Sequence, residues 1–308
     1  MKTFLGIEIG GSKLQLFVGD QSARVLERLK LPIDRLRGGQ GIRVQINEAL
    51  AKLLKRSDVA AIAVGFGGPV DRRSGRIARS HQIEGWSDFP LQTWLRDLTG
   101  KPVLVDNDAN MAALGEALHG AGKGADPVFY VTLGSGVGGG LVVNGEIFHG
   151  APPGESEIGH LRLDQQGTIV EDRCSGWAVD SKIRQLIKSG RGTILNDLVG
   201  TAIRGEARFL SRALEAKDAE AEHILRETAD DLGLALSHVT QLFHPEVIVI
   251  GGGLSLVGEP LRAAVAEALP RHIMKVFGQG PAIRLAGLGE DSVPVGCLAA
   301  AAKRHAHS

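Results

Sequence analysis

Two glycine-rich turns are the first chemical signal in this chain. Gly6–Lys13 (GIEIGGSK) and Gly134–Gly140 (GSGVGGG) each join two apolar runs. Because glycine has no Cβ and readily adopts positive φ angles, such turns let backbone N–H groups approach an anion closely. Two of them in one chain suggest two clamps on one polyphosphate, and therefore a nucleotide.

Acidic residues at the end of another apolar run could transfer protons. Asp106, Asn107 and Asp108 directly follow the run at 103–105, just before a helical pattern begins. The free N–H groups of a helix start favour an ionised carboxylate. Asp108 could therefore be a general base or the residue that caps the helix. We interpret Asp106 as structural or as lying behind the reacting groups.

Glu157 and His160 form a second polar group around Gly159, which allows a tight bend. One carboxylate acceptor and one imidazole could bind the hydroxyl groups of a sugar. Pairs with this spacing are also common on protein surfaces, so the spacing alone does not decide between the two readings.

Hydrophobic periodicity indicates the elements that must position these residues. Strands are expected at 3–9, 13–18, near 25–26, and at 60–64, 103–105, 128–131, 141–143, 247–250 and 282–287. Helices are expected at 40–55, 111–118, 176–189 and 219–242, from about 257, and at 293–304. The second half repeats the strand–glycine turn–strand plan of the first, and residues 119–124 are expected to be a hinge or linker.

The second glycine turn also matches a dinucleotide-binding pattern through Gly134, Gly136 and Gly139. That pattern requires a helix directly after the turn, so that the helix start can meet the pyrophosphate. Here the turn leads into an apolar strand and the hairpin signal Asn144-Gly145. The dinucleotide interpretation therefore fails on its context.

Composition limits the remaining function classes. The 308 residues are enough for two domains, and 35 basic residues balance 35 acidic ones, which argues against nucleic-acid binding. The two cysteines fit no zinc spacing and are expected to be free thiols. No apolar run is long enough to span a membrane, and the pattern of the first residues leads us to expect no signal peptide. We expect a cytoplasmic protein.

In combination, the motifs resemble the ROK family of sugar kinases and repressors. Gly6–Lys13 is similar to the family's first phosphate loop, and Thr132–Gly140 to its second. The segment 107–116 resembles its catalytic segment, 157–160 its sugar-binding segment and 248–255 its adenosine-side loop. The motifs fall in the family's order and span nearly the whole chain.

The resemblance implies an α/β fold of two actin-like (ribonuclease H-like) domains with mixed sheets and an interdomain cleft. The first domain would comprise residues 1–118, completed by a C-terminal helix at 292–308. The second would comprise residues 119–291. A homodimer is a further implication of the family.

The resemblance also implies an ATP-dependent hexose kinase with Asp108 as general base. The implied sugar-binding residues are Asn107, Glu157, His160, Glu171, Gly68 and Gln82. The implied nucleotide-binding residues are Gly10, Gly11, Ser12, Lys13, Gly134, Ser135, Gly136, Gly138, Gly139, Gly252 and Gly253. Glu8 and Asp108 would hold Mg²⁺ through water.

Three features depart from the family pattern. The stretch 161–170 lacks the cysteines with which many members hold a structural zinc, so we predict no zinc. Glu8 stands where the acid of the first phosphate loop is usually Asp. Its extra methylene should still reach a magnesium-bound water. Ser12 and Ser135 stand where Thr is common, and they keep the hydroxyl group.

The acceptor is most simply the O6 hydroxyl of glucose. Fructose and N-acetylhexosamines remain alternatives, because Glu157, His160 and Glu171 suit several sugars. A non-catalytic, sugar-sensing regulator is the alternative from another class. Repressors of the family carry an N-terminal helix-turn-helix. Because a first strand is predicted at about Thr3, we expect none in this chain.

Overall fold

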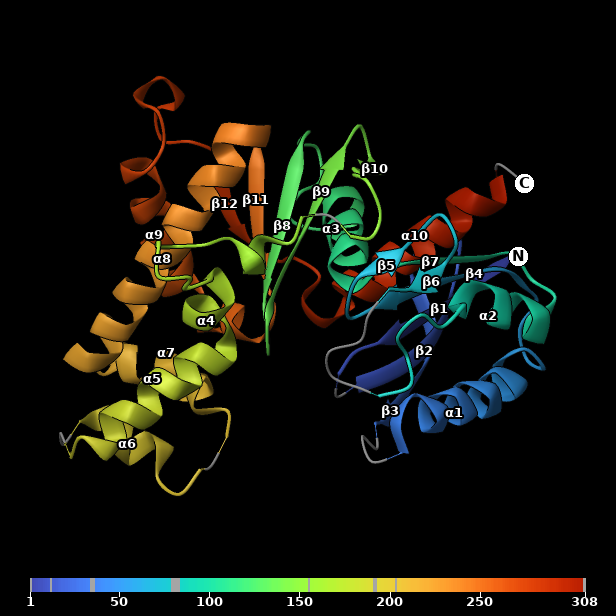
Figure 1. The fold of residues 1–308 in the computed structure, drawn as a ribbon, viewed down its shortest axis with the longest axis horizontal. Helices are drawn as coiled ribbons and strands as arrows, with labels where there is room; N and C mark the ends of the chain where they lie inside the picture. Colours follow the sequence, from blue (N-terminus) through green and yellow to red (C-terminus); the bar gives the residue numbers. More distant parts are fainter. Residues whose placement is uncertain are drawn as a thin grey trace. The chain divides into compact units, whose positions relative to one another are not determined.

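The computed structural model describes residues 2–11, 13–33, 37–78, 84–154, 156–190, 193–202 and 204–306. The chain folds into two compact units. One consists of residues 1–123, 145–155 and 290–308, and the other of residues 124–144 and 156–289. Helices and a mixed sheet form each unit (Figure 1).

The first unit contains a sheet with the strand order β3-β2-β1-β4-β7. Its strands are β1 (Thr3–Ile9), β2 (Lys13–Gly19), β3 (Val25–Pro32), β4 (Val59–Phe66) and β7 (Val103–Asn107). Its helices are α1 (Gly38–Leu53), α2 (Leu91–Thr99), α3 (Asp108–His119) and α10 (Ser292–Ala306). Three short strands complete it, β5 (Val70–Asp71), β6 (Arg76–Ile77) and β10 (Glu146–Ile147).

Burial on both faces explains the apolar runs of this sheet. β1 and β2 form an antiparallel hairpin, and β4 and β7 run parallel to β1. Leu5, Ile7 and Ile9 of β1 share a core with buried residues of α1 and α2. Helix α10 packs against β1, β4 and α3. Strands covered by helices on both faces read as nearly continuous hydrophobic segments.

The second unit contains most of a sheet with the order β10-β9-β8-β11-β12. Its strands are β8 (Val128–Leu133), β9 (Val137–Val143), β11 (Val247–Gly251) and β12 (Ala282–Leu285). Its α-helices are α4 (Val170–Cys174), α5 (Gly176–Lys188), α6 (Ile194–Val199), α7 (Leu210–Glu215), α8 (Ala219–Phe243) and α9 (Glu259–Ala268). Its short 3₁₀ turns include η2 (Ile158–His160), η3 (Glu206–Phe209) and η4 (Gly253–Val257).

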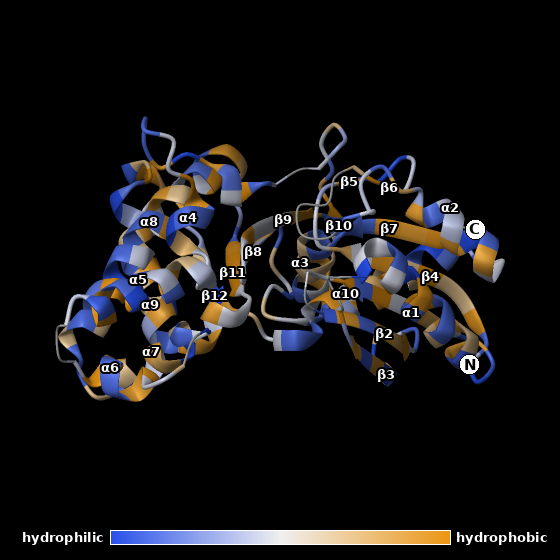
Figure 2. Ribbon diagram, turned by 60° about the horizontal axis from the view of Figure 1, so that its bottom comes forward, coloured by the Kyte–Doolittle hydropathy of each residue, from blue (hydrophilic) through white to orange (hydrophobic). Residues whose placement is uncertain are grey.

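The second sheet follows the plan of the first. β8 and β9 are antiparallel, whereas β11 and β12 run parallel to β8. Figure 2 shows β11 as a hydrophobic strand, like β4 and β7 of the first unit, and its five residues are all buried. The strand–glycine turn–strand echo in the sequence therefore reflects two sheets of the same topology.

Most of the predicted elements are confirmed, and the mixed α/β class with them. The glycine turn at 134–136 leads into strand β9. The dinucleotide-binding pattern would have required a helix there, so its rejection is confirmed. Helices α2, α4, α6 and α7 and the hairpin β5–β6 were not predicted. None of the helices in the described ranges is long and apolar enough to cross a bilayer.

The two units differ from the predicted domain boundaries at a few segments. Residues 119–123, 145–155 and 290–291 group with the first unit. For 145–155 the reason is local, because β10 packs against α3 and Glu146 pairs with Lys303 of α10. The first unit thus contains three separate stretches of chain.

Candidate active site

Three parallel strands of the first unit end side by side. Ile9 of β1 pairs with Phe66 of β4, which pairs with Asn107 of β7. The Gly67 N–H donates to the Ile9 carbonyl at 2.9 Å and continues this alignment beyond the strands. Ligands of α/β sheets commonly bind at the carboxyl ends of parallel strands. This edge is therefore the candidate active-site edge of the unit.

Asp108 is the first residue of α3, and Asn107 is the residue that caps the helix. The Asn107 Oδ1 accepts from the backbone N–H of Ala109 at 2.8 Å and of Asn110 at 3.3 Å. The capping role that the sequence left open for Asp108 thus belongs to its neighbour. The helix start does not depend on the Asp108 carboxylate for its cap.

Glycines leave room around the Asp108 carboxylate. A Cβ on Gly67 would lie 3.2 Å from Asp108 Oδ2 and 3.4 Å from the Cα of Gly10. The end of β4 therefore touches both the first glycine turn and the candidate base. A side chain at position 67 would lie directly against the Asp108 carboxylate.

Asp108 has an unusual electrostatic environment. Burial and then the negative charge of Glu8 raise the pKa of Asp108 from 3.8 to about 6. The Ala109 N–H and the positive charge of Lys13 act in the opposite direction. A carboxylate with a pKa closer to neutrality is a better proton acceptor than an ordinary aspartate, while most of it stays ionised at pH 7.

Polar contacts within the first hairpin hold Glu8. The Lys13 Nζ lies 2.9 Å from Glu8 Oε1, and the Gln15 Nε2 donates to Glu8 Oε2. At the turn itself, the Gly10 N–H donates to the Lys13 carbonyl at 2.9 Å. Lys13 was predicted to bind nucleotide, and here its ammonium group neutralises Glu8. Ser12 lies outside the described residues.

Glu8 and Asp108 offer a suitable donor set for Mg²⁺. Both carry carboxylate oxygens, and they are close enough for one to shift the pKa of the other. Mg²⁺ is commonly held by one or two carboxylates together with substrate phosphates and water. The two residues fit this arrangement. In the described part of the chain, no group of three or more His, Cys, Asp or Glu side chains is placed to hold a metal ion.

The two polar side chains beside Asp108 are already engaged. The Asn107 Nδ2 donates to the Gly68 carbonyl at 3.1 Å, which joins two of the predicted sugar-binding residues. Asp106 is buried, and its Oδ1 accepts from the Asn107 N–H at 2.7 Å and from Asn110 Nδ2 at 2.9 Å. The His149 Nε2 lies 2.7 Å from the other Asp106 oxygen. Asp106 therefore braces the segment that carries Asp108.

The second glycine turn lies in the other unit, against Glu171. The Gly134 N–H donates to the Gly136 carbonyl at 2.9 Å, which closes the turn. The Glu171 Oε2 accepts from the Val137 N–H at 2.9 Å. A Cβ on Gly136 would lie 2.4 Å from the same carboxylate oxygen. A predicted sugar-binding residue and a predicted phosphate loop are thus in direct contact.

Glu157 and His160 flank the same loop. Glu157 directly precedes the 3₁₀ turn η2, His160 is its last residue, and both side chains are exposed. Between them, Gly159 packs against β9, where a Cβ would lie 2.2 Å from the Val137 carbonyl. The unit therefore brings Glu157, His160 and Glu171 together around the start of β9, and Ser135 at the turn is also exposed.

The remaining predicted binding residues lie at several places in the chain. Gly138 and Gly139 belong to β9. Gly252 adopts a φ of +81°, and a Cβ there would lie 2.6 Å from the Leu133 backbone. Gly253 has open space around it. Gln82 lies outside the described residues.

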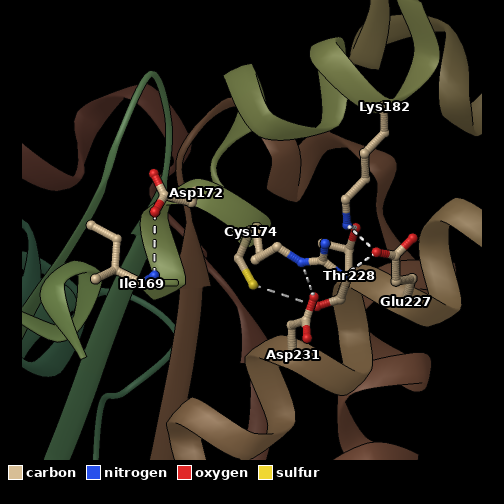
Figure 3. A network of polar contacts seen from close by, with 8 residues as sticks. Ile169, Asp172, Cys174, Lys182, Glu227, Thr228 and Asp231 are labelled. Carbon is tan, nitrogen blue, oxygen red and sulfur yellow. Dashed lines mark hydrogen bonds and ion pairs between the residues drawn. The ribbon is translucent and has the colours of Figure 1, made fainter. Parts of the chain in front are cut away.

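The segment after His160 contains a buried thiol in place of a cysteine cluster. The Cys174 Sγ points to the carbonyl oxygen of Thr228 at 3.7 Å (Figure 3). Burial raises the pKa of Cys174 to about 12, so the thiol stays protonated at neutral pH. Zinc binds thiolate rather than thiol. The absence of zinc remains a prediction.

Comparison with known proteins identifies the family. The model described as "ROK family" matches residues 4–304. The chain belongs to the ROK family. Among its ROK relatives, the glucokinase of Halalkalibacterium halodurans is 32% identical over 310 residues, which cover 95% of this chain and 93% of that protein.

Solved ROK structures share this fold. The glucokinase from Streptomyces griseus, in complex with glucose and AMPPNP, has a TM-score of 0.83 and 28% identity and covers 98% of this chain and 99% of its own. The ROK hexokinase from Thermus thermophilus has a TM-score of 0.81 and 29% identity over 99% of this chain and 100% of its own. These similarities support a sugar kinase, a phosphotransferase with an alcohol acceptor. They also confirm the predicted actin-like fold.

A regulator is also similar to this chain, at a lower sequence identity than the kinases above. A putative xylose repressor from a Caldicellulosiruptor species is 23% identical over 97% of this chain, which spans 73% of the repressor.

Proposed function

We propose that this ROK protein transfers the γ-phosphoryl group of ATP to a hexose, with glucose O6 as the acceptor and Asp108 as the general base. The observation that carries the proposal is the state of Asp108. Asp108 stands at the start of α3, and Asn107 caps the helix in its place. Burial and the charge of Glu8 raise the pKa of Asp108 to about 6. A carboxylate in this state is suited to proton transfer near neutral pH.

The proposed reaction is one displacement at phosphorus. The sugar hydroxyl oxygen forms a bond to the γ-phosphorus while the bond from that phosphorus to the bridging oxygen of ADP breaks. The proton of the hydroxyl passes to the Asp108 carboxylate. Phosphoryl transfer of this kind depends mainly on positioning and on neutralising charge.

The two glycine turns would bind the phosphates through backbone N–H groups. Glu157, His160 and Glu171 would bind the sugar hydroxyls, and their grouping at the start of β9 supports this assignment. Support for the ligands comes from the S. griseus relative, which was solved with glucose and AMPPNP. Glu8 and Asp108 would hold Mg²⁺ through water, and the bound ion would neutralise phosphate charge.

The experiment is a coupled assay of ADP release with ATP, MgCl₂ and a panel of glucose, mannose, fructose, glucosamine and N-acetylhexosamines. We expect the highest kcat/KM with glucose. Asp108→Asn should lower kcat by about 10²–10⁴-fold, because the amide cannot accept the proton. Asp97→Asn, a change of an exposed acid on α2, is the matched control and should retain wild-type activity.

The other outcomes have defined meanings. ADP release with fructose or an N-acetylhexosamine in preference to glucose would change the acceptor and leave the kinase in place. Sugar binding in calorimetry without ADP release would favour the sensing regulator. An Asp108→Asn protein that keeps most of its activity would refute Asp108 as the base.

A further inference from the structure

One buried glutamine lies inside the first hairpin, where apolar residues surround it in sequence. Gln15 belongs to β2 between Leu14 and Leu16, and its side chain is 0% exposed. It stands directly opposite Glu8 in the antiparallel pairing of β1 and β2. Directly opposed residues of antiparallel strands project on the same face of the sheet. Gln15 thus shares a face with the acid of the first phosphate loop.

Gln15 and Lys13 hold the Glu8 carboxylate from one strand. The Gln15 Nε2 donates to Oε2, while the Lys13 Nζ lies 2.9 Å from Oε1. Residues two apart on a strand point to the same side. β2 therefore supplies one donor for each carboxylate oxygen, which fixes both the place and the orientation of the group.

The contact is not one that stability alone would favour. Among the residues that the structure describes, the Gln15 Oε1 has no hydrogen-bond partner although it is buried. Leaving a buried polar atom unsatisfied lowers stability. An unbranched apolar side chain would remove this cost, but it would leave the buried Glu8 Oε2 without its donor. The amide is therefore better explained by what it does for Glu8.

Glu8 has a particular need for such a partner. A glutamate reaches further than an aspartate and has one more rotatable bond, so its carboxylate must lose more freedom to occupy one position. The Gln15 amide removes part of this freedom.

We propose that Gln15 is a positioning residue that fixes the Glu8 carboxylate for Mg²⁺ and the nucleotide phosphates. It acts through Glu8 and touches neither substrate. This inference rests on the proposed function, in which Glu8 holds Mg²⁺ through water.

A double-mutant cycle tests the inference with the full chain. The variants are Gln15→Met, Glu8→Asp and the two combined, with Gln40→Met on the exposed surface of α1 as the control. The first measurement is calorimetric titration of Mn²⁺ in the presence of AMPPNP, which requires no turnover. The second is kcat and KM for the hexose as functions of Mg²⁺ concentration.

In the Glu8 background, Gln15→Met should weaken Mn²⁺ binding by about tenfold or more, because losing a partner that orients a metal ligand typically lowers metal affinity about 10–100-fold. It should raise the Mg²⁺ concentration needed for activity and leave the hexose KM within about twofold. In the Glu8→Asp background the same change should have little effect, because the shorter carboxylate no longer reaches the amide.

Three results would overturn the inference. One is wild-type Mn²⁺ affinity in Gln15→Met. Another is an equal loss in both backgrounds, which would indicate a general effect on the hairpin. The third is an equal loss in Gln40→Met. If Gln15→Met does not fold, Gln15→Leu provides the same comparison. If the wild type phosphorylates no hexose, the proposed function fails, but the Mn²⁺ titration still decides the role of Gln15.

Discussion

At the scale of residues, the candidate base depends on a second carboxylate. Burial raises the pKa of Asp108 most, Glu8 raises it further, and Lys13 lowers it. Asp108 must be ionised to accept a proton. Because its pKa is raised, protonation inactivates it at a pH closer to the physiological range. The environment of Asp108 thus gives a stronger proton acceptor at the cost of a narrower working range.

This balance predicts the pH dependence of the reaction. kcat/KM should fall as pH decreases through about 6, where Asp108 of the free enzyme becomes protonated. Glu8→Gln removes a negative charge and should move this limb to lower pH, whatever its effect on the maximal rate. Profiles of kcat/KM between pH 5 and 8 measure the acidic limb of the wild type and of Glu8→Gln, with Asp97→Asn as the control. A limb that stays in place or moves upward in Glu8→Gln would contradict the assignment.

At the scale of elements, short contacts at strand ends hold the site together. Asp106 is the next-to-last residue of β7, and its carboxylate binds the backbone N–H of Asn107, the side chain of Asn110 and the ring of His149. His149 belongs to the segment 145–155, which is distant in sequence but part of the same unit. The start of α3 is therefore braced by a segment that follows β9 in the chain.

His149→Ala should show the value of this brace. Losing a hydrogen bond to a buried carboxylate should lower the free energy of unfolding by about 1–3 kcal/mol. Because Asp106 holds the residues beside Asp108, kcat should fall as well. His149→Gln keeps an N–H donor and should recover part of both losses. Chemical unfolding and steady-state kinetics measure them, and exposed His272→Ala is the control. Equal behaviour of the two alanine variants would refute the brace.

At the scale of the whole molecule, periodicity and glycine turns predict the sheets well. Long buried runs such as 247–250 and 128–131 became strands at almost the predicted bounds. Helix α2 was not predicted, because only Leu91 and Leu95 of its nine residues are buried and its apolar pattern is short. Topology also decided which segments join a unit, as for 145–155.

The candidate site was only partly readable from the sequence. The segment 106–108 drew attention because of its acids, but its cap could not be assigned without backbone geometry. Gln15 was not recognised as a candidate. Its signal was a single polar residue in an apolar strand, and the register of the hairpin was needed to set it opposite Glu8. Pairwise contacts across strands are not encoded in local spacing.

The last helix closes the first unit, and its packing leads to a prediction for the whole molecule. A Cβ on Gly296 of α10 would lie 1.7 Å from the Met111 carbonyl of α3, so any side chain there must push the two helices apart. Gly296→Ala should therefore lower the stability of the first unit by at least about 2 kcal/mol.

Hydrogen exchange should show faster exchange in peptides from 2–11, 59–66 and 103–119, although they lie far from position 296 in sequence. Peptides from 219–251 should exchange at nearly the wild-type rate, since they belong to the other unit. Gly253→Ala, which has open space for a Cβ, is the matched control and should change neither set. Equal acceleration in both sets of peptides would mean that the two units unfold as one.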